Sequence, residues 1–393
     1  MSRIGVSVIG ASNRSSMIFR HLKDHPEEGF IAGVYDLIPA KARCVLDHHG
    51  LKDARVYESL AQAVGDGQAQ AAFVAPTDCA HAECAIAALE AGRHVFCEKP
   101  MALTIEDCDA IIRAAQGARG ILYVGMNLRH SPVHAALHEL LAGGKLGKLL
   151  TIEANEYYYD GKTYFRRWNR LRKFGGGMWL TKACHDFDLL NWMAGGRARK
   201  VLACSSLSYY KPQAGAGTHC RACPIASTCP DYFDIQTRKS WLVTQLAALT
   251  EQASGVAQDI CLYNSDKDTF DNGIAVVEYD NDVRATYTVN VVSARDTRQM
   301  RLMGTEGAAE GDMATGMVTY WRRHTKETTV QDVREKMKSG HGGSDGSIMA
   351  DFFRCCRTGD RPKSSWREGR ACVQVGLAAT ASCDTGQAVT ITD

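Results

Sequence analysis

Short runs of β-branched and other apolar residues alternate with amphipathic stretches along the first third of the chain. The apolar runs predict strands at 3–9, 30–35, 71–75, 94–97 and 121–125. The stretches between them predict helices at 15–24, 40–49, 80–91 and 103–115. Strands that alternate with helices across short connections are typical of a parallel sheet covered by helices on both faces. The pattern therefore predicts a doubly wound Rossmann domain, of the α/β class, over residues 1–126.

A different pattern begins after Pro132. It predicts helices and strands at 133–141, 149–156, 178–193, 348–357 and 389–391, and a hairpin over 272–292. The residues of this segment alternate as in a hairpin, with Asp280-Asn281-Asp282 at its bend. Residues 127–393 are therefore expected to form a second domain of the α+β class, built on an open and mainly antiparallel sheet.

The composition limits the classes of function. The 393 residues are 45% hydrophobic and 23% charged, and 46 Lys and Arg against 44 Asp and Glu leave a net charge of +2. This balance gives no electrostatic reason to bind nucleic acid or an anionic membrane. No apolar stretch approaches the ~20 residues that span a bilayer, and the first residues lack the pattern of a secretion signal. We expect a cytoplasmic protein that acts on a small molecule.

The first predicted strand runs into a turn of small and polar residues that a helix follows. Such a turn lets backbone N–H groups and the helix dipole meet a pyrophosphate, although serines replace the second and third glycines of the fingerprint. Asp36, at the tip of the next strand, suits the ribose hydroxyls of NAD. NADP stays open because Arg14 could hold a phosphate, and an ordinary turn without a ligand is the other alternative. The residues expected to hold the dinucleotide are Gly10, Ser12, Asn13, Arg14, Ser15 and Asp36.

Two further motifs follow in order along the chain. Glu98-Lys99-Pro100 ends a buried strand, and a GGG-x₇-His-x₂-Asp segment runs from Gly175 to Asp188. Together with the Rossmann start, they make the chain similar to the Gfo/Idh/MocA oxidoreductases, the family of glucose–fructose oxidoreductase and inositol dehydrogenase. The resemblance implies a C-terminal domain whose open sheet often serves as an oligomer interface, and hence a homo-oligomer.

The resemblance also implies roles for single residues. Lys99 would lie near the nicotinamide and the substrate hydroxyl, and His185 would be the catalytic histidine. Arg129 would be a basic residue on the substrate side. Further contacts with the cofactor are implied for Pro76, Glu98, Trp168 and Arg170.

The chemistry of alcohol oxidation points to the same residue types. It needs a base for the hydroxyl proton while hydride leaves the carbon. Histidine suits this task near neutral pH, and lysine stabilises a developing alkoxide. On one continuous helix, Thr181, His185 and Asp188 share a face. Asp188 is therefore a candidate to orient the imidazole, with a capping or surface role as the alternative, and His185 could instead be a packed core histidine.

One position departs from the family pattern. Many sugar dehydrogenases of the family carry Asp where this chain has Thr181, and a threonine cannot act as a base. Lys182 beside it predicts a pocket with two lysines, which suits a sugar acid or a stabilised enolate, and Lys182 is expected to assist catalysis. Thr181, Asp188 and His341 are expected to line the substrate site, although the glycine-rich segment around His341 could equally be a flexible loop.

The chain carries 15 cysteines, of which three lie close together in an insertion at about 209–261. Cys220 and Cys223 form a Cys-x₂-Cys knuckle, and Cys229 follows. This spacing predicts a structural zinc site. Its fourth ligand would be His219, Asp231, Cys204 or Cys261. A redox pair and free thiols are the alternatives.

Taken together, the motifs predict an NAD(P)-dependent oxidoreductase acting on a secondary hydroxyl of a sugar, sugar acid or cyclitol. One alternative keeps the fold but retains NAD for redox-neutral elimination or glycoside cleavage. The other is a non-enzymatic protein that senses the dinucleotide.

Overall fold

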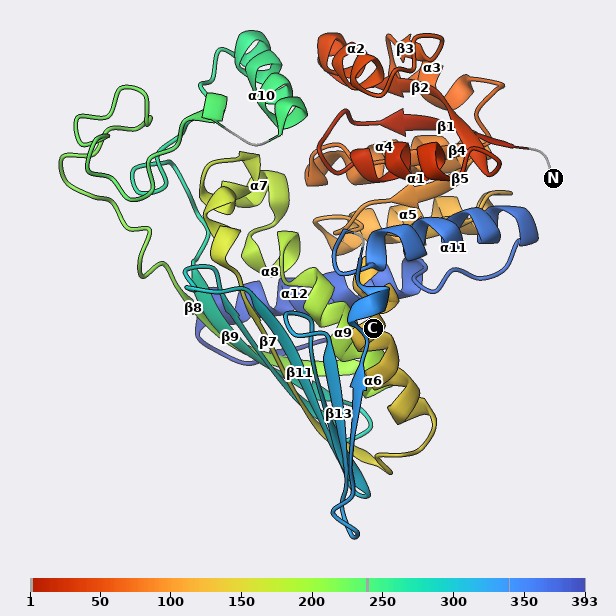
Figure 1. The fold of residues 1–393 in the computed structure, drawn as a ribbon, viewed down its shortest axis with the longest axis vertical. Helices are drawn as coiled ribbons and strands as arrows, with labels where there is room; N and C mark the ends of the chain where they lie inside the picture. The colour runs from red at the N-terminus through yellow and green to blue at the C-terminus, as the bar shows by residue number, and fades with distance from the viewer. Residues whose placement is uncertain (1–2, 238–239, 339, 393) are drawn as a thin grey trace.

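The computed structural model describes residues 3–237, 240–338 and 340–392, and these ranges form two sheets, shown in Figure 1. The first sheet is parallel and six-stranded, in the order β3-β2-β1-β4-β5-β6. Its strands are β1 (Ile4–Ile9), β2 (Gly29–Tyr35), β3 (Arg55–Tyr57), β4 (Ala71–Val74), β5 (His94–Cys97) and β6 (Leu122–Val124). The chain builds outward from β1 in one direction and then restarts at β4 in the other. This reversal leaves a crevice at the carboxyl ends of β1 and β4, where sheets of this kind bind ligands.

Helices from distant parts of the chain cover the first sheet. One core joins it to α1 (Ser16–Asp24), α2 (Pro39–His48), α10 (Trp241–Ser254) and α11 (Ser344–Thr358). The other face packs against α3 (Leu60–Gly65), α4 (His81–Glu90) and α5 (Ile105–Gly117). Phe352 of α11 contacts Phe96 of β5 and Tyr123 of β6 edge-on, at ring-centroid distances of 5.5 and 6.1 Å. The sheet that begins the chain is therefore completed by a helix near its end.

The second sheet has nine strands in the order β14-β13-β12-β11-β7-β10-β9-β8-β15. They are β7 (Leu149–Tyr157), β8 (Ala198–Ser206), β9 (Asn272–Tyr279), β10 (Arg284–Asn290), β11 (Thr297–Gly304), β12 (Gly307–Asp312), β13 (Met317–Arg322), β14 (Thr328–Asp332) and β15 (Val389–Thr390). All neighbours are antiparallel except β7 and β10. Buried and exposed residues alternate along β9 and β10, so one face is packed and the other open.

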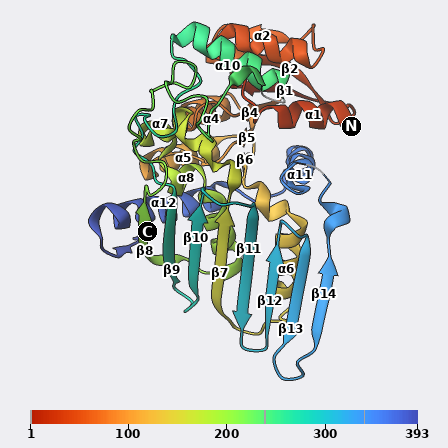
Figure 2. The ribbon, with the colours of Figure 1, turned by 60° about the vertical axis from the view of Figure 1, so that its left-hand side comes forward.

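Three helices pack on the buried face of this sheet: α6 (Pro132–Ala142), α9 (Cys184–Ala194) and α12 (Trp366–Thr385). Figure 2 shows α6 behind the strands and the opposite face of β7, β10 and β11 turned outward. The α12 helix also contacts α5 and so joins the two sheets. No helix of the described ranges is long and apolar enough to cross a membrane.

The predicted fold class is confirmed, and so is the hairpin, which is β9 and β10. One predicted helix is wrong. The segment expected to be continuous over 178–193 divides into α8 (Met178–Thr181) and α9, with Lys182 at φ −114° between them. The break takes Thr181 off the helix that carries His185 and Asp188. The sequence also gave no clear signal for β11 to β14, because exposed polar residues dominate strands such as β14.

Candidate active site

The turn after β1 is tight and depends on one glycine. Gly10 has φ +99°, and a Cβ there would lie 2.6 Å from the backbone of Ala75 and the nitrogen of Pro76. Ser12 donates to the carbonyl oxygen of Ala75 at 3.1 Å, and Ser15 donates to that of Ser12 at 2.6 Å. The turn therefore packs against the end of β4 at the crevice, where a glycine leaves room for a ligand to approach the backbone.

Asp36 lies beside this turn at the end of β2. Its Oδ2 accepts the N–H of Ala11 at 2.8 Å and lies 3.3 Å from Nζ of Lys41, while Oδ1 accepts the N–H of Ile38 at 2.9 Å. These bonds fix the carboxylate next to the glycine turn. That is the position from which a carboxylate meets the ribose of a bound dinucleotide.

The guanidinium of Arg14 is paired with two carboxylates and is therefore not free to bind a phosphate. It pairs with Glu98 at 2.5 Å and with Asp345 at 3.1 Å. His341 approaches the same carboxylate, with Nδ1 3.0 Å from Oδ2 of Asp345, and Asn127 donates to Oδ1 at 2.9 Å. Arg14 thus ties the turn to the end of β5 and to the first turn of α11, and Asn13 beside it is exposed.

The structure brings Lys99 and His185 together. Lys99 follows β5, and its Nζ donates to the backbone oxygen of Thr181 at 2.8 Å. His185 lies in the first turn of α9 and is 7% exposed. Burial, and then the charges of Lys99 and Arg298, hold the pKa of His185 well below its ordinary value. Its imidazole is therefore neutral near pH 7.

Lys182 is paired with a carboxylate under this site. Its Nζ lies 2.6 Å from Oε1 of Glu156 and 4.1 Å from the ring centre of Tyr158. Glu156 also pairs with Arg298, which reaches Asp186 at 3.1 Å. Burial raises the pKa of Glu156, but the opposing charges of Arg298 and Lys182 bring it to about 2. The second lysine of the predicted pocket therefore carries its own counter-charge.

Asp188 does not orient His185. Both of its oxygens accept from Arg129, at 2.7 and 2.8 Å, and both residues are buried. Among the described residues, Nδ1 of His185 has no hydrogen-bond partner. The prediction failed because a shared helix face cannot tell which partner a carboxylate will choose. The guanidinium of Arg129 is therefore taken up by Asp188 and by the carbonyl oxygen of Lys363.

Two other predicted residues lie on a short 3-10 turn, Trp168–Arg170. Trp168 is half-buried and its ring lies against Gly175, where an added Cβ would come within 3.3 Å of it. Arg170 pairs with the exposed Asp266 at 2.7 Å. In this structure Arg170 therefore holds two loops together.

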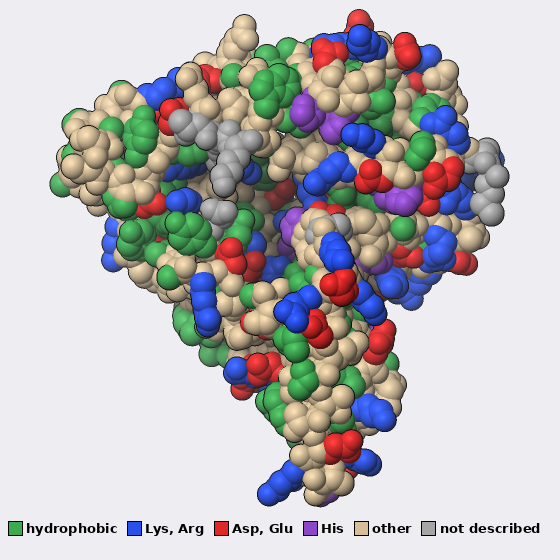
Figure 3. All heavy atoms as spheres, in the orientation of Figure 1, with side chains coloured by type: hydrophobic (Ala, Val, Ile, Leu, Met, Phe, Trp, Pro, Cys, Tyr) green, Lys and Arg blue, Asp and Glu red, His purple; other side chains and the backbone are tan. Residues whose placement is uncertain are grey.

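One buried carboxyl group was missed. Asp78 begins a 3-10 turn, Asp78–Ala80, directly after β4, and its Oδ2 accepts the hydroxyl of Thr181 at 3.0 Å. The sequence signal was its place, two residues after Pro76 at the carboxyl edge of the sheet. Figure 3 shows the surface hollowed between the insertion and the lobe of the first sheet, with basic and histidine side chains along the hollow.

Two models of known protein families match the chain. Residues 4–126 match the family model described as the oxidoreductase family, NAD-binding Rossmann fold. Residues 138–391 match the model described as the oxidoreductase family, C-terminal alpha/beta domain. The chain belongs to the Gfo/Idh/MocA oxidoreductase family. The resemblance seen in the motifs is thereby confirmed.

Relatives within this family are distant. A putative oxidoreductase of Bacillus subtilis, YteT, is 28% identical over 72% of this chain and 71% of its own length. Myo-inositol 2-dehydrogenase of Thermotoga maritima is 27% identical over 51% of this chain and 58% of its own length, so the chain spans only about half of that enzyme. Levoglucosan dehydrogenase in complex with NADH and levoglucosan shares the fold, with a TM-score of 0.79, 16% identity and full coverage of both chains.

The residues at the crevice fit the dinucleotide of this family. Gly10 lets the turn pack directly against the backbone of Ala75 and Pro76 at the crevice, and the carboxylate of Asp36 stands beside the turn. Lys99 and the neutral His185 lie past the end of β5, on the side toward α8 and α9. A dinucleotide stretched from Asp36 across the turn would direct its reactive end toward these two residues.

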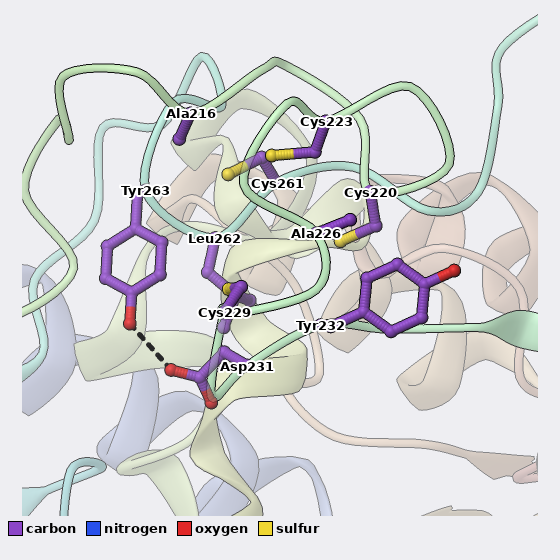
Figure 4. Close-up of a pocket in the computed structure, with 10 residues that line it drawn as sticks. All are labelled: Ala216, Cys220, Cys223, Ala226, Cys229, Asp231, Tyr232, Cys261, Leu262 and Tyr263. Carbon is purple, nitrogen blue, oxygen red and sulfur yellow. Dashed lines mark hydrogen bonds between the residues drawn. The ribbon is translucent and has the colours of Figure 1, made fainter.

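The predicted zinc site finds no support in the structure. Cys220, Cys223, Cys229 and Cys261 line one small pocket of the insertion, shown in Figure 4. The sulfurs of Cys223 and Cys261 turn toward each other, whereas that of Cys220 points toward Ala226. Within the described ranges, no three His, Cys, Asp or Glu side chains form a group that could hold a metal ion. The Cys-x₂-Cys spacing was insufficient because the loop spreads its thiols along the pocket wall.

Proposed function

We propose that the protein transfers hydride between NAD(H) and a secondary hydroxyl of a sugar, sugar acid or cyclitol. The observation that carries the proposal is the meeting of Lys99 and a neutral His185 beside the crevice. The relatives named inositol dehydrogenase and levoglucosan dehydrogenase support the substrate class. When bound, NAD⁺ supplies the hydride acceptor.

Each residue then has a defined task. The ammonium of Lys99 stabilises the negative charge that develops on the substrate oxygen. The neutral imidazole of His185 accepts a hydrogen bond from the hydroxyl and orients it. Because Glu156 neutralises Lys182, the site does not present two free positive charges. Neutral polyols are therefore as well suited as the sugar acids that the two lysines first indicated.

A substrate panel tests the proposal. Purified protein is incubated with sugars, sugar acids, inositols and glycosides, and both NADH absorbance and released products are followed. Steady NADH production with at least one polyol is the expected result. One relative is named 2,7-anhydro-N-acetylneuraminate hydratase, a name that indicates a reaction without net oxidation. Turnover of a substrate without NADH would replace the dehydrogenase with redox-neutral chemistry. Binding of NAD with no turnover would leave a dinucleotide sensor.

Asp36 should set the choice of dinucleotide. In Asp36→Ala, the ribose hydroxyls lose their acceptor and a 2′-phosphate loses a repelling charge, while Lys41 becomes free to approach it. We expect the Kd for NAD to rise about tenfold, the equivalent of about 1.4 kcal/mol, and the Kd for NADP to fall. Calorimetric titration with both dinucleotides measures this. An unchanged preference would remove Asp36 from the cofactor site.

We propose that the open face of the nine-stranded sheet joins copies of the chain. Leu202 of β8 pairs with Val276 of β9 and is 49% exposed, and Ile274 on the same face is 48% exposed. An apolar patch of this kind at a sheet surface marks an interaction site. Leu202→Glu should shift the protein toward monomers in light scattering without changing its Tm by more than a few degrees. An unchanged mass would move the interface elsewhere.

We place the protein in the cytoplasm. All 15 cysteines are unpaired, including buried ones such as Cys97 and Cys372. Free thiols in this number suit a reducing compartment. Mass spectrometry of protein alkylated in intact cells checks this, and extensive disulfide formation would contradict it.

A further inference from the structure

Asp78 is a buried carboxyl group that has no role in the reaction as proposed so far. It is 7% exposed, and its Oδ2 accepts the hydroxyl of Thr181 at 3.0 Å. The backbone oxygen of that same threonine accepts Nζ of Lys99 at 2.8 Å. Thr181 therefore binds the ammonium of Lys99 through its carbonyl oxygen and the carboxyl group of Asp78 through its hydroxyl. One residue, Thr181, thus connects this carboxyl group to the lysine that faces the substrate.

Within the described ranges, Lys99 is the cation that acts on Asp78. Lys99 and Glu98 follow β5, and the thiols of Cys79, Cys97 and Cys184 complete the set that interacts with it electrostatically. Burial raises the pKa of Cys97 and of Cys184, so both thiols stay neutral at pH 7.

The neighbouring helices add no further partner for the carboxyl. On α7 (Arg172–Gly175), Arg172 binds Asp384 and Lys173 lies over the ring of Phe174. His81 at the start of α4 is held by the carbonyl oxygen of Pro100 at 2.7 Å. Burial raises the pKa of Asp78 to about 7, against the opposing effects of Lys99 and the Thr181 hydrogen bond.

His185 cannot keep a proton in this site. Besides burial, the groups that act most on its pKa are all basic residues, Lys99 and Arg298 first among them, and each lowers it. The carboxylate expected to support it, Asp188, is bound to Arg129. An imidazole in this position can orient a hydroxyl, but the proton that leaves the hydroxyl must come to rest on another group.

We propose that Asp78 is the group that receives this proton. The inference rests on the proposed oxidation of an alcohol. Thr181 passes its hydroxyl proton to the carboxylate of Asp78, to which it already donates at 3.0 Å, and takes a proton from the ammonium of Lys99, whose Nζ lies 2.8 Å from the backbone oxygen of the same threonine. The neutral amine that this leaves on Lys99 accepts the hydroxyl proton of the substrate as the O–H bond breaks, the C=O bond forms and hydride leaves the carbon for the nicotinamide. Lys99 and Thr181 end unchanged, and Asp78 ends as a neutral acid.

Asp78→Asn tests the carboxyl without changing its size. We expect kcat for oxidation to fall at least 10²-fold, the usual size of a lost proton-transfer group, with KM and the Kd for NAD within about twofold. In the natural protein kcat for oxidation should rise with pH through about 7, because the carboxylate form is needed, and this rise should be absent in the variant. Thr181→Val should lower kcat similarly and Thr181→Ser should restore it. Cys79→Ser, on the same turn, should leave activity unchanged.

A measurement without cofactor or substrate separates this inference from the proposed function. Asp186 is also a buried carboxyl group with a pKa raised to about 7, so the infrared spectrum of Asp78→Asn is subtracted from that of the natural protein. The protonated-carboxyl band left in this difference belongs to Asp78 and should disappear as pH rises through about 7. As pH rises from about 4 to 7, the Tm of the natural protein should also fall relative to that of the variant. In this range the folded state keeps the proton on Asp78, whereas the unfolded state releases it. If these titrations occur but no substrate is oxidised, the proposed function fails and so does the transfer step. If oxidation occurs with full kcat in Asp78→Asn, or if no titration is seen, the inference about Asp78 fails alone.

Discussion

Lys99→Met should lower turnover by about 10³-fold and leave the Kd for NAD within about twofold. Methionine preserves the length of the side chain but removes the charge that stabilises the substrate oxygen. It also removes the hydrogen bond that Nζ of Lys99 donates to the backbone oxygen of Thr181. The measurement is kcat for the best substrate of the panel, together with calorimetric titration of NAD.

The control for this change is Lys52→Met, on an exposed loop of the first sheet, which should keep full activity. His185→Asn should reduce kcat less than Lys99→Met, because an amide can still accept a hydrogen bond from the hydroxyl. Activity that survives both Lys99→Met and His185→Asn would place the reaction elsewhere in the molecule.

Glu156→Gln should destabilise the fold by about 3–5 kcal/mol, the usual cost of breaking a buried ion pair, and lower Tm by about 4–6 °C. Glu156 lies between the cations Lys182 and Arg298, and all three side chains are about nine-tenths buried. Glutamine fills the same space but leaves Lys182 without a counter-charge. Differential scanning calorimetry of the two proteins measures the effect.

The pH dependence of this loss of stability follows from the lowered pKa of Glu156. Glu156 has a folded-state pKa of about 2 against an ordinary 4.5, so its contribution is complete above about 4.5 and disappears as pH falls through 2. The difference between the two proteins should therefore be present above about pH 5 and should shrink as pH falls toward 2. Glu153→Gln on the same strand removes only an exposed pair with Arg301, worth at most about 1 kcal/mol. Equal effects of the two substitutions would contradict the buried network.

All strands of the first sheet except β3 could be predicted from the sequence, because those strands are mostly buried apolar runs. The strand β3 has only three residues and is partly exposed, so it left no such run. The nine-stranded sheet could be predicted in β7, in the β9–β10 hairpin and in β15, but not in the other strands. Strands such as β13 and β14 have one or both faces exposed, and an exposed strand leaves no continuous apolar signal. The break in the helix at Lys182 could not be predicted from the sequence either, since the residues on both sides of it have ordinary helix propensities.

At the site, the motifs predicted which residues would meet but not which would pair. Lys99 and His185 come together as expected. Arg14 and Asp188 instead bind Asp345 and Arg129, partners that lie 331 and 59 residues away along the chain. Such partners depend on tertiary packing, which spacing along one helix or turn does not contain. For the same reason Asp78 was missed, although it binds Thr181, which stands where many sugar dehydrogenases of the family carry Asp.

The cover that α11 gives to the first sheet has a consequence for synthesis on the ribosome. The six strands are complete once residue 124 has been made, but the aromatic face formed by Phe96 and Tyr123 waits for Phe352. From the end of β6 at 124 to the start of α11 at 344 the ribosome adds 220 residues, which takes roughly 10–40 s. During this interval α1 and α2 cover one part of this face, and the part around Phe96 and Tyr123 stays exposed. Transiently exposed apolar surface makes a nascent chain prone to aggregation, so the first sheet gains its full protection only when α11 has been made.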